Sequence, residues 1–144
     1  MDDLKTALGK VLANTFVMYF KAHAYHWNVE GMFFSQYHDF FGKLYEELHG
    51  AVDPIAEEIR SLDAYAPGSF SRFMELTDIQ DELNVPMGRE MAVKLLADNA
   101  IVLSTLNMAF KLADQFDKQG LADFVAGRID VHNKHAWMLR SITK

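Results

Sequence analysis

The chain has 144 residues, half of them hydrophobic and 24% charged, and its net charge is −6 at pH 7. This composition predicts a single folded domain over residues 1–144 rather than a disordered chain. The negative charge argues against general binding to nucleic acid or anionic membranes, and no run of about eighteen apolar residues would span a bilayer. The lack of cysteine excludes disulfides and thiolate metal sites. Together with a first segment unlike a signal peptide, it predicts a cytoplasmic protein.

Apolar residues recur with a period near 3.6 in four long segments, which predicts four helices. We expect these helices over residues 3–28, 34–62, 87–117 and 121–142. Gly31 is a suitable stop after the first helix, and Ser35 is a candidate N-cap for the second. Pro54 lies inside the second helix and is expected to kink it near Gly50, because proline removes a backbone hydrogen bond.

The connection between the second and third helices is unusually long, covering residues 63–86. So long a loop normally carries structure of its own, and the stretch Ser71-Arg-Phe-Met-Glu-Leu predicts a short helix within it. The predicted fold class is therefore all-α. It is a four-helix bundle with one long crossover, which carries a short extra helix between the second and third helices.

The stretch from His26 to Glu57 contains the most distinctive chemistry of the chain. His26, His38, Asp53 and Glu57 provide imidazole and carboxylate groups, a ligand set that suits iron, manganese or zinc. However, His38 and Asp53 are fifteen residues apart, which is about 22 Å along a continuous helix. Either the second helix breaks, or a second copy of the chain supplies half of the site.

Several motifs together resemble the Dps family of mini-ferritins, within the ferritin-like superfamily. They are KAHAYHWNVEGMFF, a histidine twelve residues after His26, and DPIAEEI, with further similarity in SFSRFMELTDI and KHAWMLR. The resemblance covers nearly the whole chain. It implies a hollow homo-oligomeric shell, a dodecamer built from two-fold dimers. Such a shell oxidises Fe(II), preferably with hydrogen peroxide, stores the ferric product and protects against oxidative damage. Iron is the implied metal, with zinc or manganese as substitutes.

The resemblance also assigns roles to individual residues. His26 and His38 would bind iron from one chain, and Asp53 and Glu57 from its two-fold partner. Trp27 matches a tryptophan beside the family's site, where it would intercept oxidising equivalents. A two-fold axis makes the two second helices antiparallel, so facing residues have numbers that add up to a constant. This constant is 91 if His38 faces Asp53.

One position departs from the family pattern. Gly42 stands where the family usually has an aspartate, four residues after the second histidine. By the same two-fold relation Gly42 faces His49 of the second copy, so we hypothesise that His49 completes a modified metal site. The simpler alternative is that His49 is a polar interface residue. A packing or access reason for Gly42 is also expected, since glycine weakens a helix by roughly 1 kcal/mol relative to alanine.

Other readings of these residues stay open. His26 and His38 would also suit interface histidines bonded to carboxylates, Asp53 could cap a kinked helix, and His23 is expected near the site or on the surface. His132 and His135 are expected on the surface, because no carboxylate is evident at a helical spacing that would place it beside them.

Acidic residues are expected on solvated or cavity-facing surfaces. Asp123 falls where relatives place an acid that lines a three-fold pore, and Asp39, Glu46 and Glu47 would either face the cavity or be solvated. Two alternatives to an iron-oxidising shell remain. One is a DNA-compacting protein, although the basic tail typical of such relatives is absent. The other is a structural shell whose ferroxidase site is impaired by Gly42.

Overall fold

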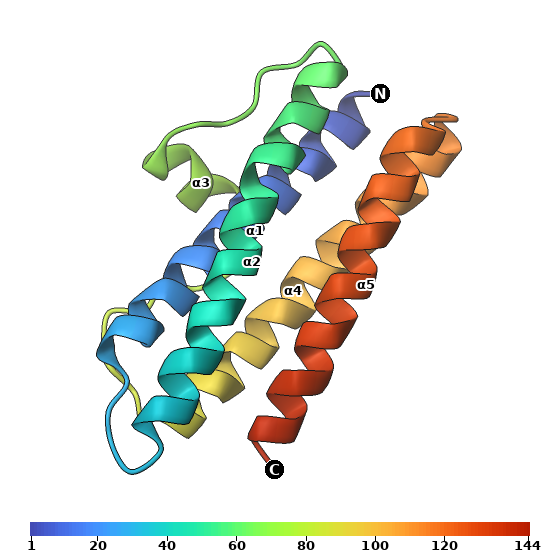
Figure 1. Ribbon diagram of the computed structural model, residues 1–144. Helices are drawn as coiled ribbons and strands as arrows, with labels where there is room; N and C mark the ends of the chain where they lie inside the picture. The colour runs from blue at the N-terminus through green and yellow to red at the C-terminus, as the bar shows by residue number, and fades with distance from the viewer.

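Five helices make up the regular structure of residues 1–144 in the computed structural model (Figure 1). They are α1 (Asp2–Asn28), α2 (Phe34–Ser61), α3 (Phe70–Leu76), α4 (Gly88–Gln115) and α5 (Gln119–Ile142). The four long helices form the bundle, and α3 belongs to the crossover between α2 and α4. The predicted all-α four-helix bundle, with a short extra helix in one long crossover, is confirmed.

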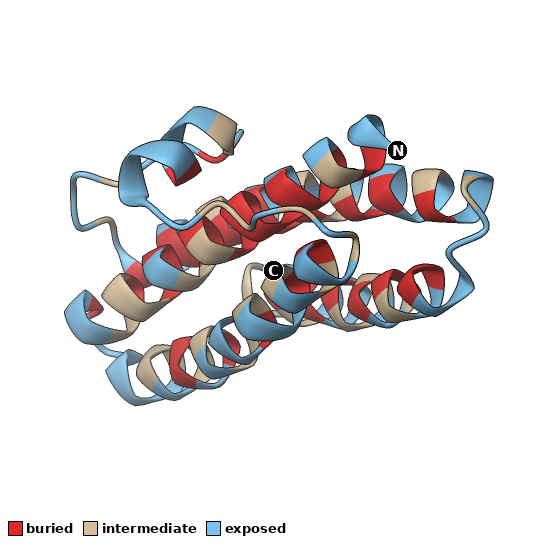
Figure 2. Cartoon of the chain, turned by 90° about the horizontal axis from the view of Figure 1, so that it is seen from above, coloured by how far each residue is buried: buried red, intermediate tan, exposed pale blue.

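The bundle is held together by the inward faces of the long helices. In Figure 2 the buried residues lie between helices, and the outer faces are exposed. The largest fully buried side chains include Leu8, Phe41, Ile55, Leu95 and Leu139. By length and composition α4 is the one helix that could cross a membrane. Here it packs against α1 and α5 as a core helix of the bundle.

A tight turn joins α1 to α2. Helix α1 ends at Asn28, within the predicted range, and its C-cap is the extended residue Val29. Gly31 lies further along, in the turn, with a φ of +115°, a conformation that a residue with a side chain rarely adopts. The predicted cap at Ser35 is wrong. Helix α2 begins one residue earlier, after Phe33, and no side chain accepts a hydrogen bond from its first turn.

Helix α2 continues through Pro54 without interruption (Figure 1). Proline cannot donate to the carbonyl one turn earlier, which belongs to Gly50, but Gly50 is exposed and its carbonyl can bond to water. Because the helix does not break, His38 and Asp53 of one chain stay about 22 Å apart. They cannot bind one ion together, and only a second copy could unite them.

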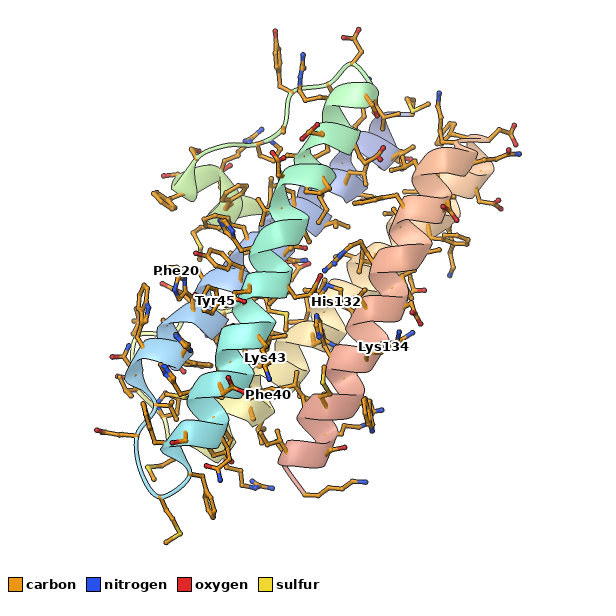
Figure 3. The ribbon with its side chains drawn as sticks, in the orientation of Figure 1. Phe20, Phe40, Lys43, Tyr45, His132 and Lys134 are labelled. Atoms are coloured by element: carbon orange, nitrogen blue, oxygen red, sulfur yellow. The ribbon has the colours of Figure 1, made fainter.

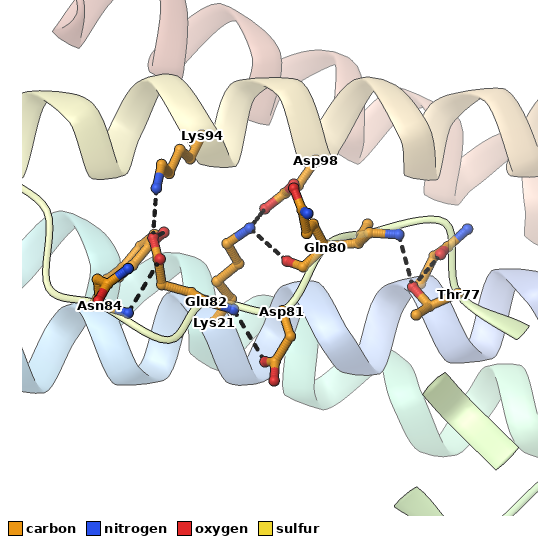
Figure 4. Close-up of polar contacts among 11 residues, drawn as sticks. Lys21, Thr77, Gln80, Asp81, Glu82, Asn84, Lys94 and Asp98 are labelled. Carbon is orange, nitrogen blue, oxygen red and sulfur yellow. Dashed lines mark hydrogen bonds and ion pairs between the residues drawn. The ribbon is translucent and has the colours of Figure 1, made fainter. Parts of the chain in front are cut away.

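Polar side chains of the bundle anchor the crossover (Figure 4). Lys21 on α1 donates to the carbonyl of Gln80 at 3.0 Å and forms a buried ion pair with Asp98 on α4 at 3.0 Å. Glu82 accepts hydrogen bonds from Tyr25 at 2.7 Å and Lys94 at 2.9 Å. These bonds explain how a link of this length stays ordered.

Candidate metal site at the bundle surface

His26 and His38 lie side by side where α1 ends and α2 begins. Their rings are stacked with centroids 3.8 Å apart. Nδ1 of His26 bonds to the carbonyl of His38 at 2.7 Å, and Nδ1 of His38 bonds to the carbonyl of His26 at 2.7 Å. The two histidines therefore hold each other through a reciprocal pair of hydrogen bonds, here called the histidine pair.

These bonds determine which nitrogen of each ring can bind a metal. A carbonyl oxygen only accepts, so each Nδ1 must carry a hydrogen and donate it. In the neutral ring the lone pair then lies on Nε2, which makes no other hydrogen bond within the chain. A ring nitrogen bonded to a carbonyl while the other is free is the usual arrangement of a metal-binding histidine. The histidine pair thus presents two prepared ligand atoms.

Gly42 leaves room for the His26 ring in its present position. A Cβ atom at position 42 would lie 3.1 Å from both Cε1 and Nδ1 of His26. The ring cannot move aside easily, because it is bonded to the carbonyl of His38 and stacked on the His38 ring. The structure therefore supplies the expected packing reason for Gly42.

A Gly42→Ala variant is expected to separate helix stability from metal binding. Alanine favours the helix by roughly 1 kcal/mol, but its methyl group would displace the His26 ring. We expect Fe(II) affinity to fall about 10- to 100-fold, as for other changes that misplace a metal ligand. Isothermal titration under argon would measure it. Gly127→Ala is the matched control, since nothing lies within 4 Å of the added Cβ there. Unchanged affinity in Gly42→Ala would contradict this role.

Asp53 and Glu57 form the second half of the candidate site. Both are exposed and lie one turn apart on α2, so they share a helix face. The Asp53 carboxyl raises the pKa of Glu57, first by a hydrogen bond and then by its charge. A nearby cation would stabilise the charged forms of both carboxylates.

Aromatic side chains surround the histidine pair. The ring of His23 stacks on Tyr45 with centroids 3.7 Å apart and lies 4.4 Å from Trp27 (Tyr45 is labelled in Figure 3). Burial, with the neighbouring His26 and His49, lowers the pKa of His23. Burial also raises the pKa of Tyr19, whose hydroxyl lies in a hydrogen bond with His23 Nδ1 at 3.0 Å. His23 is thus a half-buried neighbour of the pair.

The remaining predicted site residues are all exposed. His49 is exposed on α2 and lies against the ring of Tyr19, with centroids 4.8 Å apart. Trp27 is 56% exposed, and Asp123 is exposed in the first turns of α5. Within one chain, no three histidine or acidic side chains are placed to hold a metal ion. The ligand set of His26, His38, Asp53 and Glu57 therefore stays a prediction that requires a second copy.

The surface position expected for His132 and His135 is wrong. His132 is 0% and His135 is 5% exposed. His135 Nε2 donates to Glu47 at 2.7 Å, so a carboxylate partner exists, and Glu47 faces the bundle rather than a cavity. Arg128 joins the same cluster. These residues were missed although positions 128, 132 and 135 fall in phase with the buried positions 121, 125 and 139 of α5.

This buried cluster has strongly shifted pKa values. Burial, reinforced by the charge of Arg128, lowers the pKa of His132 to about 3. Burial alone would raise the pKa of Glu47, but hydrogen bonds from His135 and Arg128 outweigh it and lower that pKa to about 2. At neutral pH His132 is therefore neutral and Glu47 is charged.

The His132 pKa predicts a loss of stability in mild acid. An unfolded histidine takes up a proton near pH 6.5, whereas folded His132 does so only near pH 3. Between these values the unfolded chain binds more protons, so stability falls as pH falls. We expect this group to reduce the free energy of unfolding by about 2 kcal/mol between pH 7 and pH 5. In the His132→Gln variant, denaturant unfolding should show a change in the free energy of unfolding between pH 7 and pH 5 that is smaller by this amount. A change equal to that of the wild type would contradict the lowered pKa of His132.

Comparisons with known proteins agree with this fold. The sequence matches the ferritin-like domain family over residues 5–144. It is 34% identical to a low temperature-induced protein of Nostoc, over 93% of this chain and 76% of that protein. It is 30% identical to the DNA protection during starvation protein of Brevibacillus brevis, over 93% of this chain and 90% of that one.

Solved structures show the same similarity. The Dps protein of Vibrio cholerae, described as a member of a superfamily of ferritin-like diiron-carboxylate proteins, superposes with a TM-score of 0.95. It is 29% identical over 99% of this chain and 90% of that chain. Dps from Staphylococcus aureus gives a TM-score of 0.95 at 26% identity, over 100% of this chain and 97% of that one. The chain therefore belongs to the ferritin-like superfamily and, within it, to the Dps family.

Proposed function

We propose that the protein is a ferroxidase and iron store, which oxidises Fe(II) with hydrogen peroxide at a site shared by two subunits. The reciprocal hydrogen bonds of His26 and His38 are the observation that carries this proposal. They leave both Nε2 atoms free to bind Fe(II) from one subunit. Asp53 and Glu57 of a second copy would add the carboxylate oxygens, which favour the harder Fe(III) product.

The chemistry needs no nucleophile. Peroxide accepts two electrons, one from each of two Fe(II) ions, so no hydroxyl radical is released. The protein's contribution is to hold the ions and to supply unprotonated ligands, so Fe(II) competes with protons for the same ligand atoms. The exposed Trp27 beside the pair would intercept stray oxidising equivalents.

The second copy would be a two-fold partner in a larger homo-oligomer, expected to be a dodecamer. Exposed apolar side chains support such a partner: Phe20 is 50%, Phe70 is 78% and Met74 is 46% exposed. All three line a groove of about 730 Å³ between α1, α3 and the crossover, which His49 also lines. A surface of this kind would be covered by another subunit.

We include His49 as a further ligand from the partner, in the space that an aspartate at position 42 would fill in relatives. Two observations support it: Gly42 leaves no side chain there, and His49 is exposed. A His49→Ala variant should bind Fe(II) more weakly than the wild type. Equal binding and oxidation would remove His49 from the site while leaving the main proposal intact.

An anaerobic Fe(II) titration followed by peroxide addition tests the function. We expect saturable Fe(II) binding, then ferric absorbance that rises with a stoichiometry of two irons per peroxide. A protein that is only a structural shell would give no more ferric product than buffer alone. Zinc or manganese, if they substitute for iron, should compete in the binding step.

A further inference from the structure

A positively charged side chain occupies the middle of the bundle, between α2 and α5. Nη1 of Arg128 donates to Oε2 of Glu47 at 2.5 Å, and Nη2 donates to Oε1 of Glu47 at 3.1 Å and to Nε2 of His132 at 3.0 Å. Arg128 is 8% exposed, and Figure 3 labels His132 on α5. The subunit thus contains a fixed internal cation.

The groups around this cation are those that bind divalent metals. Glu47 supplies a carboxylate, His132 an imidazole, and Nε2 of His135 lies 2.7 Å from the same Oε1 of Glu47. One carboxylate and two imidazoles suit Fe(II), Co(II) or Zn(II). Ferritin-like di-iron proteins place glutamate and histidine ligands on facing helices in the core of such a bundle.

We propose that Arg128 fills a latent divalent-metal site formed by Glu47, His132 and His135, and that its guanidinium keeps metal ions out of the subunit interior. No three histidine or acidic side chains of the folded chain are placed to hold an ion, and the guanidinium lies within hydrogen-bond distance of both Glu47 and His132. Resting on the proposed function, this role confines Fe(II) oxidation to the site at the histidine pair.

The hydrogen bonds of the cluster prepare its ligand atoms. Nδ1 of His132 lies 2.7 Å from Oδ1 of Asn99, which can only accept, so the hydrogen lies on Nδ1 and the lone pair of Nε2 points at Arg128. Nδ1 of His135 is buried without a partner, so it can take the ring proton and free Nε2. A metal ion at the position of Arg128 Nη2 would lie 3.1 Å from Oε1 of Glu47 and 3.0 Å from Nε2 of His132. Shifts of about 1 Å would bring them to the usual bonding distance.

The test is a Co(II) titration of the full-length Arg128→Ala variant in an Asp53→Ala, Glu57→Ala background. This background removes the acids of the proposed shared site, so the result does not depend on the ferroxidase function. We expect one Co(II) per subunit with the visible absorption of a low-coordinate ion. The same background with Arg128 intact should bind at least 10-fold more weakly. Arg128→Lys, which keeps a positive charge, should also bind at least 10-fold more weakly.

Adding His135→Ala to Arg128→Ala should weaken Co(II) binding at least 10-fold. Arg128→Ala leaves Glu47 unpaired and could unfold the chain, in which case Co(II) must restore the helical circular dichroism, since metal binding would then drive folding. Three results would overturn the proposal. The Arg128→Ala variant could fold and bind no Co(II), or it could be unfolded and not be restored by Co(II). The third result is Co(II) binding of equal strength in the same background with Arg128 intact.

Discussion

Replacing either Asp53 or His38 by alanine is expected to slow peroxide-dependent Fe(II) oxidation about 100-fold or more, while the helical content stays that of the wild type. Each variant would remove a ligand from every proposed shared site, and losing even a group that supports a ligand typically weakens metal binding 10- to 100-fold. Both side chains are at or near the surface of the subunit, so the fold does not depend on them. Stopped-flow absorbance of the ferric product measures the rate.

Asp130→Ala is the matched control for Asp53→Ala. Asp130 is also an exposed helical carboxylate, and its ion pair with Lys134 lies on the surface of α5 at 3.3 Å. Its removal should leave the oxidation rate unchanged within about two-fold, because exposed ion pairs of this kind contribute little. Wild-type rates in both Asp53→Ala and His38→Ala would remove these residues from the site.

The second large effect concerns stability. Glu47→Ala should lower the free energy of unfolding by about 3 kcal/mol, because it leaves the buried guanidinium of Arg128 without its carboxylate. It also removes the acceptor of His135. Denaturant unfolding at neutral pH measures this loss. The slope of the free energy of unfolding against denaturant concentration should not change, which would show that the variant and the wild type unfold between equivalent states.

Asp39→Ala provides the comparison for Glu47→Ala. It breaks an exposed pair with Lys43 on the same helix, in which both side chains are more than two-thirds exposed, and should cost less than about 1 kcal/mol. If Glu47→Ala cost no more than Asp39→Ala, the cluster around Arg128 would contribute nothing to stability.

The periodicity of the sequence was enough to predict the bundle. Apolar residues at helical spacing located the four long helices, and the length of the crossover predicted α3. The cap at Ser35 was wrong because the turn is set by Gly31 and α2 begins before the serine. A cap depends on the local backbone, which the hydrophobic pattern does not specify.

The polar interior was harder to predict than the apolar core. His132 and His135 were expected on the surface because no carboxylate partner was evident nearby in the sequence. Glu47, the partner of His135, lies 88 residues earlier on another helix, and His132 bonds to Asn99 and Arg128 instead. Their phase with the buried positions of α5 was the available signal. Burying polar residues is costly unless they find partners, and these partners become visible only in three dimensions.

The sequence predicted the candidate ligands but not their geometry. The two histidines and two acids could be named from their spacing, but the hydrogen bonds that orient His26 and His38 required the structure. The reason for Gly42 also required it, since the contact with the His26 ring crosses from α2 to α1. The proposed meeting of the two halves requires a second subunit, because His38 and Asp53 of one chain are about 22 Å apart along α2.

Mixing two inactive variants tests the shared site most directly. His38→Ala and Asp53→Ala subunits are refolded together, so that subunits exchange, and peroxide-dependent Fe(II) oxidation is then measured. If each site takes histidines from one subunit and acids from the other, a mixed dimer keeps one intact site, and random pairing should restore about one quarter of wild-type sites. A site contained within one subunit would predict no recovery at all, and that result would contradict the account.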